Sequence, residues 1–348
     1  MPNTDNSQIR VLVTGASGYI AAHIVQLLLK KGYLVRGSVR SLKDEKKVRC
    51  LKNLHPPAKD NLELVEADLL DAESWMRAVR GCKYVMHVAS PFPIVEPSDP
   101  NELYAPAVEG TLAVLRAARG AGCVERVVLT SSTAAMVGEG KKNGLLNEED
   151  WTKMEDNVIT YCKSKALAEK AAWKFMEENP PFELVVLNPG VVWGPLIHDS
   201  FCSSAELITR MMKFQVPLVP DLRYPTIDIR DVAEAHLKAM ILSGVAGHRI
   251  ALVTETISFM RTATILKEVF GPQGYWISTL PCPYWLTWLH SFFDNGSRAV
   301  LRDFGREFNF DNTKMRKLLD IKPIDLKKTI IDMAYSLIEK GFVPKSRV

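Results

Sequence analysis

Short apolar runs alternate with amphipathic segments along the first half of the chain. The runs, rich in valine and leucine, cover residues 10–14, 34–39, 62–67, 84–89, 126–130 and 182–188. Helical spacing of apolar residues appears in segments 21–32, 71–82, 106–122 and 160–173. Gly32 and Gly81 stand at the ends of two of these segments and Asp71 at the start of one, as expected at helix ends. Because the runs are apolar on both faces, they predict parallel strands covered by helices on both sides, a doubly wound α/β fold of the Rossmann type.

A glycine-rich turn joins the first predicted strand to the first predicted helix. The stretch VLVTGASGYIAA places Gly15 and Gly18 in the turn and Ala21 where a third small residue is expected. Small residues let the backbone approach a pyrophosphate, and a helix N-terminus offers free N–H groups and a positive dipole end. In this context we predict a dinucleotide cradle rather than a merely tight turn. Its candidate cofactor-binding residues are Gly15, Ser17, Gly18, Tyr19 and Ile20.

The end of the second predicted strand distinguishes between the two nicotinamide cofactors. Folds that prefer NAD place an acidic residue there to bind the ribose 2′-hydroxyl, whereas this chain reads GSVRSLKDEKKV. Arg40 can hold a 2′-phosphate through charge-assisted hydrogen bonds, and Lys47 can add a second positive charge. We therefore predict NADPH/NADP+ as the cofactor. The alternative is that Arg40 and the charged run form only a solvated surface.

Tyr161 and Lys165 lie four positions apart in the helical segment 160–173. That spacing puts both side chains on one helix face, with an ammonium near a phenol. A nearby cation stabilises the phenolate and draws the tyrosine pKa toward neutrality, where the phenol can give up or regain a proton. The pair alone is a common pattern, and it gains meaning from the dinucleotide-binding fold around it.

Together these motifs resemble the extended short-chain dehydrogenase/reductases, within them the dihydroflavonol reductase and cinnamoyl-CoA reductase group. The resemblance runs from about Arg10 to the last helix and rests on VTGASGYI, VRGSVRS, HVASP, LTSSTAAMVG, the Tyr161/Lys165 pair and NPGVVWGP. It implies that Ser132 binds the substrate carbonyl oxygen, Tyr161 protonates it, and Lys165 binds the cofactor ribose during hydride transfer. It also implies cofactor contacts from Asp68, Leu69, Val88, Ala89, Ser90, Thr130, Pro189, Gly190 and Val191.

Ser131 and Thr133 flank Ser132, so an ordinary turn after a strand remains the alternative for this position. Three departures from the family pattern also bear on the substrate. NVITYCK replaces the Asn-Trp-Tyr-Cys-Tyr run of cinnamoyl-CoA reductases, which argues against a coenzyme A thioester. TAAMVG offers apolar residues where dihydroflavonol reductases place an asparagine, and Ala107 replaces the asparagine of a helix motif.

Residues placed near the reacting carbonyl by these motifs are mostly apolar. The candidate substrate-binding residues are Phe92, Pro93, Ser132, Met136, Val137, Trp193, Phe201 and Tyr224, although core packing is the alternative for each apolar one. The set favours a hydrophobic or aromatic aldehyde or ketone over a sugar. We therefore predict an NADPH-dependent carbonyl reductase, an oxidoreductase acting on CH–OH groups.

Two other functions stay open at this stage. A 3β-hydroxysteroid dehydrogenase or epimerase would prefer NAD, against which Arg40 argues. An NADP-sensing regulator would typically lack the Tyr161/Lys165 pair.

The helix–strand rhythm breaks after about Gly194, where the sequence becomes rich in proline and aromatic residues. A helical pattern near 205–214 and a strand-like run at 249–253 follow. We expect residues 1–193 to form an NADP-binding Rossmann domain whose sheet is completed by about 226–255. Residues 194–225 and 256–348 would form a smaller substrate-binding lobe.

Composition narrows the remaining functional classes. The 348 residues are 47% apolar with a net charge of +4, which gives no reason to expect a nucleic-acid partner. Six scattered cysteines and seven histidines lack metal-ligand spacing, so we expect no metal, and we expect His87 to be a satisfied core residue. Without a recognisable leader, a cytoplasmic enzyme working as a monomer or homodimer is expected.

One C-terminal stretch, WISTLPCPYWLTWLHSFF, is apolar and aromatic enough to suggest a membrane segment. Pro281 and Pro283 divide it, so we expect no membrane span. Peripheral membrane contact through Trp285 and Trp288 stays open.

Overall fold

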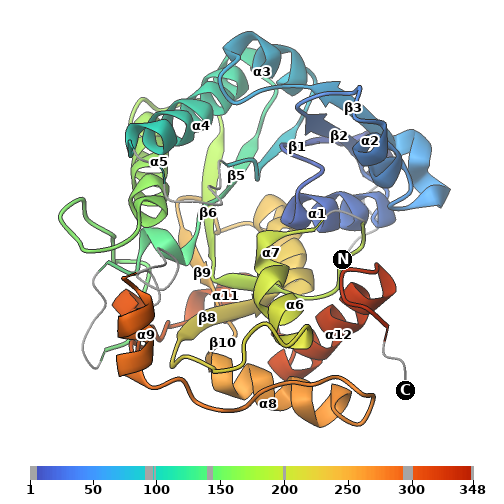
Figure 1. The fold of residues 1–348 in the computed structure, drawn as a ribbon. Helices are drawn as coiled ribbons and strands as arrows, with labels where there is room; N and C mark the ends of the chain where they lie inside the picture. Colours follow the sequence, from blue (N-terminus) through green and yellow to red (C-terminus); the bar gives the residue numbers. More distant parts are fainter. Residues whose placement is uncertain are drawn as a thin grey trace.

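The computed structural model describes residues 6–90, 97, 99–138, 144–198, 201–292 and 301–345, and a seven-stranded parallel sheet runs through it (Figure 1). The strands are β1 (Arg10–Val13), β2 (Leu34–Val39), β3 (Leu62–Glu66), β4 (Tyr84–His87), β5 (Arg126–Thr130), β6 (Glu183–Pro189) and β9 (Arg249–Leu252). Their order is β3-β2-β1-β4-β5-β6-β9, and every neighbouring pair is parallel. The predicted doubly wound α/β fold is confirmed.

Helices cover both faces of this sheet (Figure 1). α1 (Tyr19–Lys30), α7 (Ile229–Ile241) and α11 (Thr313–Leu318) pack on one face, and α3 (Ala72–Val79), α4 (Asn101–Ala121) and α5 (Thr160–Met176) pack on the other. α2 (Glu45–Lys52) follows β2. Side chains alternate between the two faces of a strand. In β1, Val11 and Val13 therefore pack in the core on one side of the sheet, and Leu12 packs in the core on the other side. The central residues of β1 are therefore apolar at successive positions.

Two helix starts show how local signals compare with tertiary packing. Asp71 caps α3 as predicted, accepting hydrogen bonds from the backbone N–H groups of Glu73 and Ser74. α4 begins at Asn101, five residues before the predicted start, and keeps Pro106 inside it. Proline removes one backbone hydrogen bond from a helix, but burial of Leu103 holds the preceding turn against the core.

The C-terminal part adds a second sheet and further helices in the lower part of Figure 1. The sheet has the order β10-β8-β7, with β7 (Val191–Trp193), β8 (Arg223–Asp228) and β10 (Glu255–Ser258). The helices are α6 (Glu206–Met212), α8 (Phe259–Phe270), α9 (Tyr284–His290) and α12 (Leu326–Glu339). β9 belongs to the large sheet and lies within residues 226–255, the range predicted to complete that sheet. The division into two domains stays a prediction.

Several structural features bear on the remaining expectations. Within the described ranges, no helix has the length and hydropathy needed to cross a membrane. Trp285 and Trp288 on α9 are about half exposed or more, and peripheral membrane contact stays a hypothesis. All six cysteines are free thiols. Among the residues that the structure describes, no group of His, Cys, Asp or Glu side chains is arranged to hold a metal ion.

Candidate active site

A cavity of about 890 Å³ lies at the carboxyl ends of the parallel strands, where the strand order reverses beside β1. Ligands of open α/β sheets bind at such a crevice because the loops on either side diverge there. The segments that follow β1 to β6 all contribute to its lining. The predicted cofactor residues in the lining are Gly15, Ser17, Gly18, Tyr19, Ile20, Arg40, Asp68, Leu69, Val88, Ala89, Ser90, Thr130, Tyr161, Lys165, Pro189, Gly190 and Val191.

The glycine-rich turn leaves room for a phosphate group at the N-terminus of α1. Gly15 has a φ of +64°, and a Cβ there would lie 3.1 Å from the Cβ of Ala89. Its N–H donates to Ser38 Oγ at 3.0 Å, which fixes the turn on β2. Gly18 is the N-cap of α1 and supplies no side-chain cap, so the N–H groups of the first helical turn stay available for an anion. This arrangement fits the pyrophosphate of a dinucleotide.

The loop after β4 is held by a buried threonine and histidine. Thr14 Oγ1 accepts the backbone N–H groups of Val88 and Ala89, each at 2.9 Å, and lies 3.0 Å from His87 Nδ1. Because the hydroxyl already accepts two hydrogen bonds, its proton is donated to Nδ1, which leaves the His87 proton on Nε2. The interpretation of His87 as a satisfied core residue agrees with this geometry.

The two basic residues predicted for the 2′-phosphate are placed differently. Arg40, directly after β2, is exposed and lines the cavity. Lys47 is not in the cavity lining, and its Nζ lies 2.8 Å from the carboxylate of Asp44 at the start of α2. The ion pair forms because Asp44 is the N-cap of α2 and Lys47 lies one turn into the helix. Of the two predicted basic residues, only Arg40 therefore lines the cavity.

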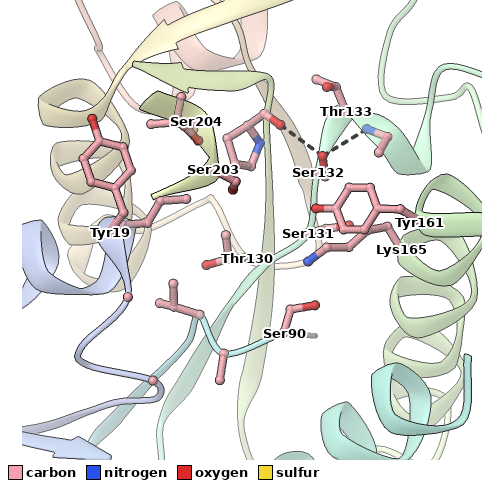
Figure 2. A pocket seen from close by; sticks show the side chains of 18 of the residues that line it. Tyr19, Ser90, Thr130, Ser131, Ser132, Thr133, Tyr161, Lys165, Ser203 and Ser204 are labelled. Carbon is pink, nitrogen blue, oxygen red and sulfur yellow. Dashed lines mark hydrogen bonds between the residues drawn. The ribbon is translucent and has the colours of Figure 1, made fainter. Parts of the chain in front are cut away.

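Ser132, Tyr161 and Lys165 come together on one side of the cavity, opposite Tyr19, Ser203 and Ser204 (Figure 2). Ser132 Oγ accepts the N–H of Ala134 at 3.1 Å and donates to the Pro189 carbonyl at 3.4 Å. Lys165 Nζ lies 5.8 Å from the centre of the Tyr161 ring. The end of β5 and one face of α5 thus bring a hydroxyl, a phenol and an ammonium to one place.

Withdrawal from water dominates the protonation of Tyr161 and Lys165. It raises the pKa of Tyr161 well above its usual range, while a hydrogen bond with Ser132 acts in the opposite direction. It lowers the pKa of Lys165 to about 8, against the opposing effect of the Glu169 carboxylate. The expectation that Lys165 draws the Tyr161 pKa toward neutrality is therefore wrong, because burial dominates. The phenol is protonated at neutral pH and can act as a proton donor.

The predicted substrate residues separate into three groups. Ser132, Val137 and Tyr224 line the cavity, whereas Phe92 and Pro93 lie outside the described residues. Met136, Trp193 and Phe201 are absent from the cavity lining, contrary to the prediction.

Each of these three side chains has another place to pack. Met136 belongs to a buried apolar cluster, and Trp193 is buried with its indole N–H donating to the Ser204 carbonyl at 2.9 Å. Phe201 packs against Phe342 at 5.3 Å between ring centres. A sequence does not distinguish apolar core residues from apolar cavity walls, because both lie away from water.

Several lining residues were not predicted because they come from irregular segments or from the C-terminal part of the chain. They include Val158, Ile159, Cys202, Ser203, Ser204, Arg302, Asp303 and Phe308. Tyr224 Oη donates to the Asp303 carboxylate at 3.5 Å, and Arg302 Nε lies 3.6 Å from the same carboxylate. This side of the cavity is therefore more polar than the sequence indicated, and no motif marks these positions.

Comparison with known proteins agrees with the geometry. A model of the NAD-dependent epimerase/dehydratase family matches residues 11–251. Cinnamoyl-CoA reductase CAD2 of Medicago truncatula is 39% identical over 267 residues, which cover 75% of this chain and 80% of that protein. The NADPH-dependent methylglyoxal reductase GRE2 of Saccharomyces cerevisiae is 36% identical over 352 residues, which cover 94% of this chain and 98% of that protein.

The solved structures include the yeast methylglyoxal/isovaleraldehyde reductase Gre2 complexed with NADPH. It matches with a TM-score of 0.79 and 33% identity, over 96% of this chain and 99% of Gre2. The family match spans more than half of the chain, and the GRE2 match spans nearly all of it. The chain therefore belongs to the NAD-dependent epimerase/dehydratase family, and within it to the extended short-chain dehydrogenase/reductases.

Proposed function

We propose that this protein is an NADPH-dependent carbonyl reductase that converts a hydrophobic or aromatic aldehyde or ketone to an alcohol. The observation that carries the proposal is the convergence of Ser132, Tyr161 and Lys165 beside a cavity that fits a dinucleotide. The NADPH-dependent reductase named among the relatives supports the cofactor and the reaction class.

NADPH would be held by the glycine-rich turn at its pyrophosphate and by Arg40 at its 2′-phosphate. The loops after β3 and β4 would contact the remaining parts of the cofactor, with Asp68 and Leu69 beside the adenine. When bound, NADPH supplies a hydride to the carbonyl carbon of the substrate. Lys165, on the same wall as Tyr161, would bind the ribose hydroxyls.

The protein's own groups would handle the oxygen of the substrate. As negative charge develops on that oxygen, the Ser132 hydroxyl donates a hydrogen bond to it and the Tyr161 hydroxyl transfers its proton. The alcohol then carries the new C–H bond and the new O–H bond, and the tyrosinate is left beside the ammonium of Lys165. The protonated state of Tyr161 at neutral pH suits this direction of the reaction.

The substrate class follows from the walls near Tyr161. Val137, Val158, Ile159 and Phe308 supply an apolar surface, and the Tyr224–Asp303 pair supplies a polar group. A medium-sized carbonyl compound with an apolar body suits this lining. The NVITYCK sequence differs from the cinnamoyl-CoA reductase run, which weighs against a coenzyme A thioester despite the relatives of that name.

The proposal is tested by NADPH oxidation against aromatic aldehydes, aliphatic ketones, dihydroflavonols, acyl-CoA esters and ketosteroids. We expect one carbonyl class to be turned over. Tyr161→Phe should lower kcat by about two to four orders of magnitude, the range for loss of a general acid, with the Kd for NADPH changed by less than about threefold. Tyr335→Phe, on the exposed surface of α12, is the matched control.

A Tyr161→Phe enzyme with a near-normal rate would refute the proton-donor role. Tight NADPH binding without turnover of any compound would instead favour a cofactor-sensing regulator.

A further inference from the structure

A buried carboxylate lies one helical turn beyond Lys165. Glu169 on α5 is 1% exposed and accepts hydrogen bonds from four side chains. The donors are Ser131 Oγ at 2.6 Å, Asn188 Nδ2 at 2.8 Å, Trp173 Nε1 at 3.3 Å, and Arg249 Nε. The proposed reaction assigns no role to this group. Burying a charge is costly unless it is paired and hydrogen-bonded, so four donors around one buried carboxylate call for a reason.

Two of the donors lie at strand ends that form the active site. Ser131 immediately precedes Ser132 at the end of β5, and Asn188 immediately precedes Pro189 at the end of β6. The Asn188 amide also donates to the backbone carbonyl of Ser132 at 3.2 Å. Glu169 therefore connects the helix that carries Tyr161 and Lys165 with the strand ends that hold Ser132.

The counterion of Glu169 is itself held in place. Arg249, at the start of β9, donates from Nη1 to the backbone carbonyls of Glu148 at 2.8 Å and Asp150 at 3.0 Å. Its guanidinium lies 3.5 Å from the centre of the Trp151 ring. The carboxylate and its partners therefore have one defined arrangement, as a positioning network requires.

Glu169 also lies among the charges around Lys165. The titratable neighbours are Tyr161, Cys162 and Glu169 on α5, His87 on β4 and, beyond Glu169, Arg249 on β9. His87 is neutral near pH 7, since burial lowers its pKa to about 3. The Glu169 carboxylate acts on Lys165 in favour of the ammonium, against the effect of burial.

We propose that Glu169 is a positioning residue for carbonyl reduction, which holds Ser132 in place opposite Tyr161 and keeps Lys165 in its charged form. Glu169 acts through these residues and does not contact the reacting atoms. The inference rests on the proposed reductase function.

The test compares Glu169→Gln, Asn188→Ala and Glu177→Gln with the wild type. The readouts are the Kd for NADPH between about pH 6 and pH 10 and kcat with the best carbonyl substrate. In the wild type, NADPH affinity should fall above about pH 8, where Lys165 loses its proton. Glu169→Gln should move this fall at least about one pH unit lower and reduce kcat at least about tenfold.

Asn188→Ala separates position from charge. It cuts the link from Glu169 to the Ser132 carbonyl but leaves the carboxylate and Arg249 in place. We expect kcat to fall about three- to tenfold with the pH dependence of NADPH binding unchanged. Glu177→Gln removes the charge of an exposed glutamate near the end of α5 and should change neither readout.

The proposal is overturned if Glu169→Gln matches the wild type in both readouts, or if Asn188→Ala leaves kcat unchanged. Circular dichroism melting curves identify variants that fail to fold. If Glu169→Gln fails to fold, Glu169→Asp, which keeps the negative charge, is tested in its place. A wild-type pH dependence of NADPH binding with a lowered kcat supports the proposal. An unchanged kcat opposes it. A wild type that neither binds NADPH nor reduces a carbonyl would instead refute the proposed function itself.

Discussion

Arg40 and Lys47 differ in what surrounds their charges, although both stand in the same basic stretch of sequence. Lys47 is paired with Asp44, whose pKa lies below its usual range because it accepts hydrogen bonds from Lys47. Arg40 lines the cavity, and a guanidinium offers several N–H groups to one phosphate. A charge-assisted hydrogen bond contributes about 1.5–3 kcal/mol, enough to determine a cofactor preference.

Arg40→Ala is therefore expected to raise the Kd for NADPH about 10- to 100-fold while changing that for NADH less than threefold. Lys47→Ala is the matched control, and it should change both affinities by less than about threefold. Fluorescence titration of each variant with both cofactors measures this. Equal losses of NADPH and NADH affinity in Arg40→Ala would show that Arg40 does not recognise the 2′-phosphate.

At the scale of elements, α5 presents its functional groups along one stripe. Tyr161, Lys165 and Glu169 are each four residues apart, so they lie on one face of the helix. The first two face the cavity, and the third faces the ends of β5 and β6. One helix thus sets the spacing between the proposed proton donor, its neighbouring ammonium and the network behind them.

At the junction of β6 and β7 the backbone passes close to that of β8 beside the cavity. A Cβ on Gly190 would lie 2.3 Å from the backbone carbonyl oxygen of Pro225 in β8, and backbone atoms cannot move aside as a side chain can. Gly190→Ala should cost about 1–3 kcal/mol in the free energy of unfolding and weaken NADPH binding. Urea denaturation measures the first effect.

Gly120→Ala is the control, because a Cβ there meets only the flexible end of Met76. If both alanine variants were equally stable, close packing at Gly190 would not be a constraint on this fold.

At the scale of the whole molecule, three histidines are buried in neutral form. Burial lowers the pKa of His23 and His236 to about 4 and that of His87 to about 3. Below pH 6.5 the unfolded chain takes up these protons and the folded chain does not, so stability falls as the pH falls. Asp231, whose pKa burial raises to about 6, takes up a proton in the folded state and offsets part of this loss.

The free energy of unfolding should accordingly drop by about 3 kcal/mol between pH 7 and about pH 5.5, at about 1.4 kcal/mol per pH unit for each histidine. Urea denaturation across this range measures it. His236→Asn should reduce the slope by about a third, because it removes one of the three buried imidazoles. A flat profile would contradict the neutral state of these side chains.

Local chemistry allowed the sequence to predict the sheet, the glycine-rich turn and the Tyr161/Lys165 pair. Each depends on residues close together in the chain: the runs that form β1 to β6, the φ of +64° at Gly15, and a four-residue helical spacing. The family resemblance supplied Ser132 and the loops after β3 and β4, which line the cavity as expected. These features were predictable because short segments determine them.

Only the tertiary structure decided the far side of the cavity and the state of its charges. Met136 and Trp193 pack in cores, while Arg302 and Asp303 reach the site from far along the chain. The partners of Glu169 lie up to 80 residues away from it, so no spacing pattern reveals them. Protonation likewise depends on burial, which opposed the effect that sequence spacing predicted for Tyr161. Sequence by itself determined which groups this protein has for chemistry. Folding decided which groups meet and how far each is removed from water, since contacts and solvation depend on the whole packed molecule.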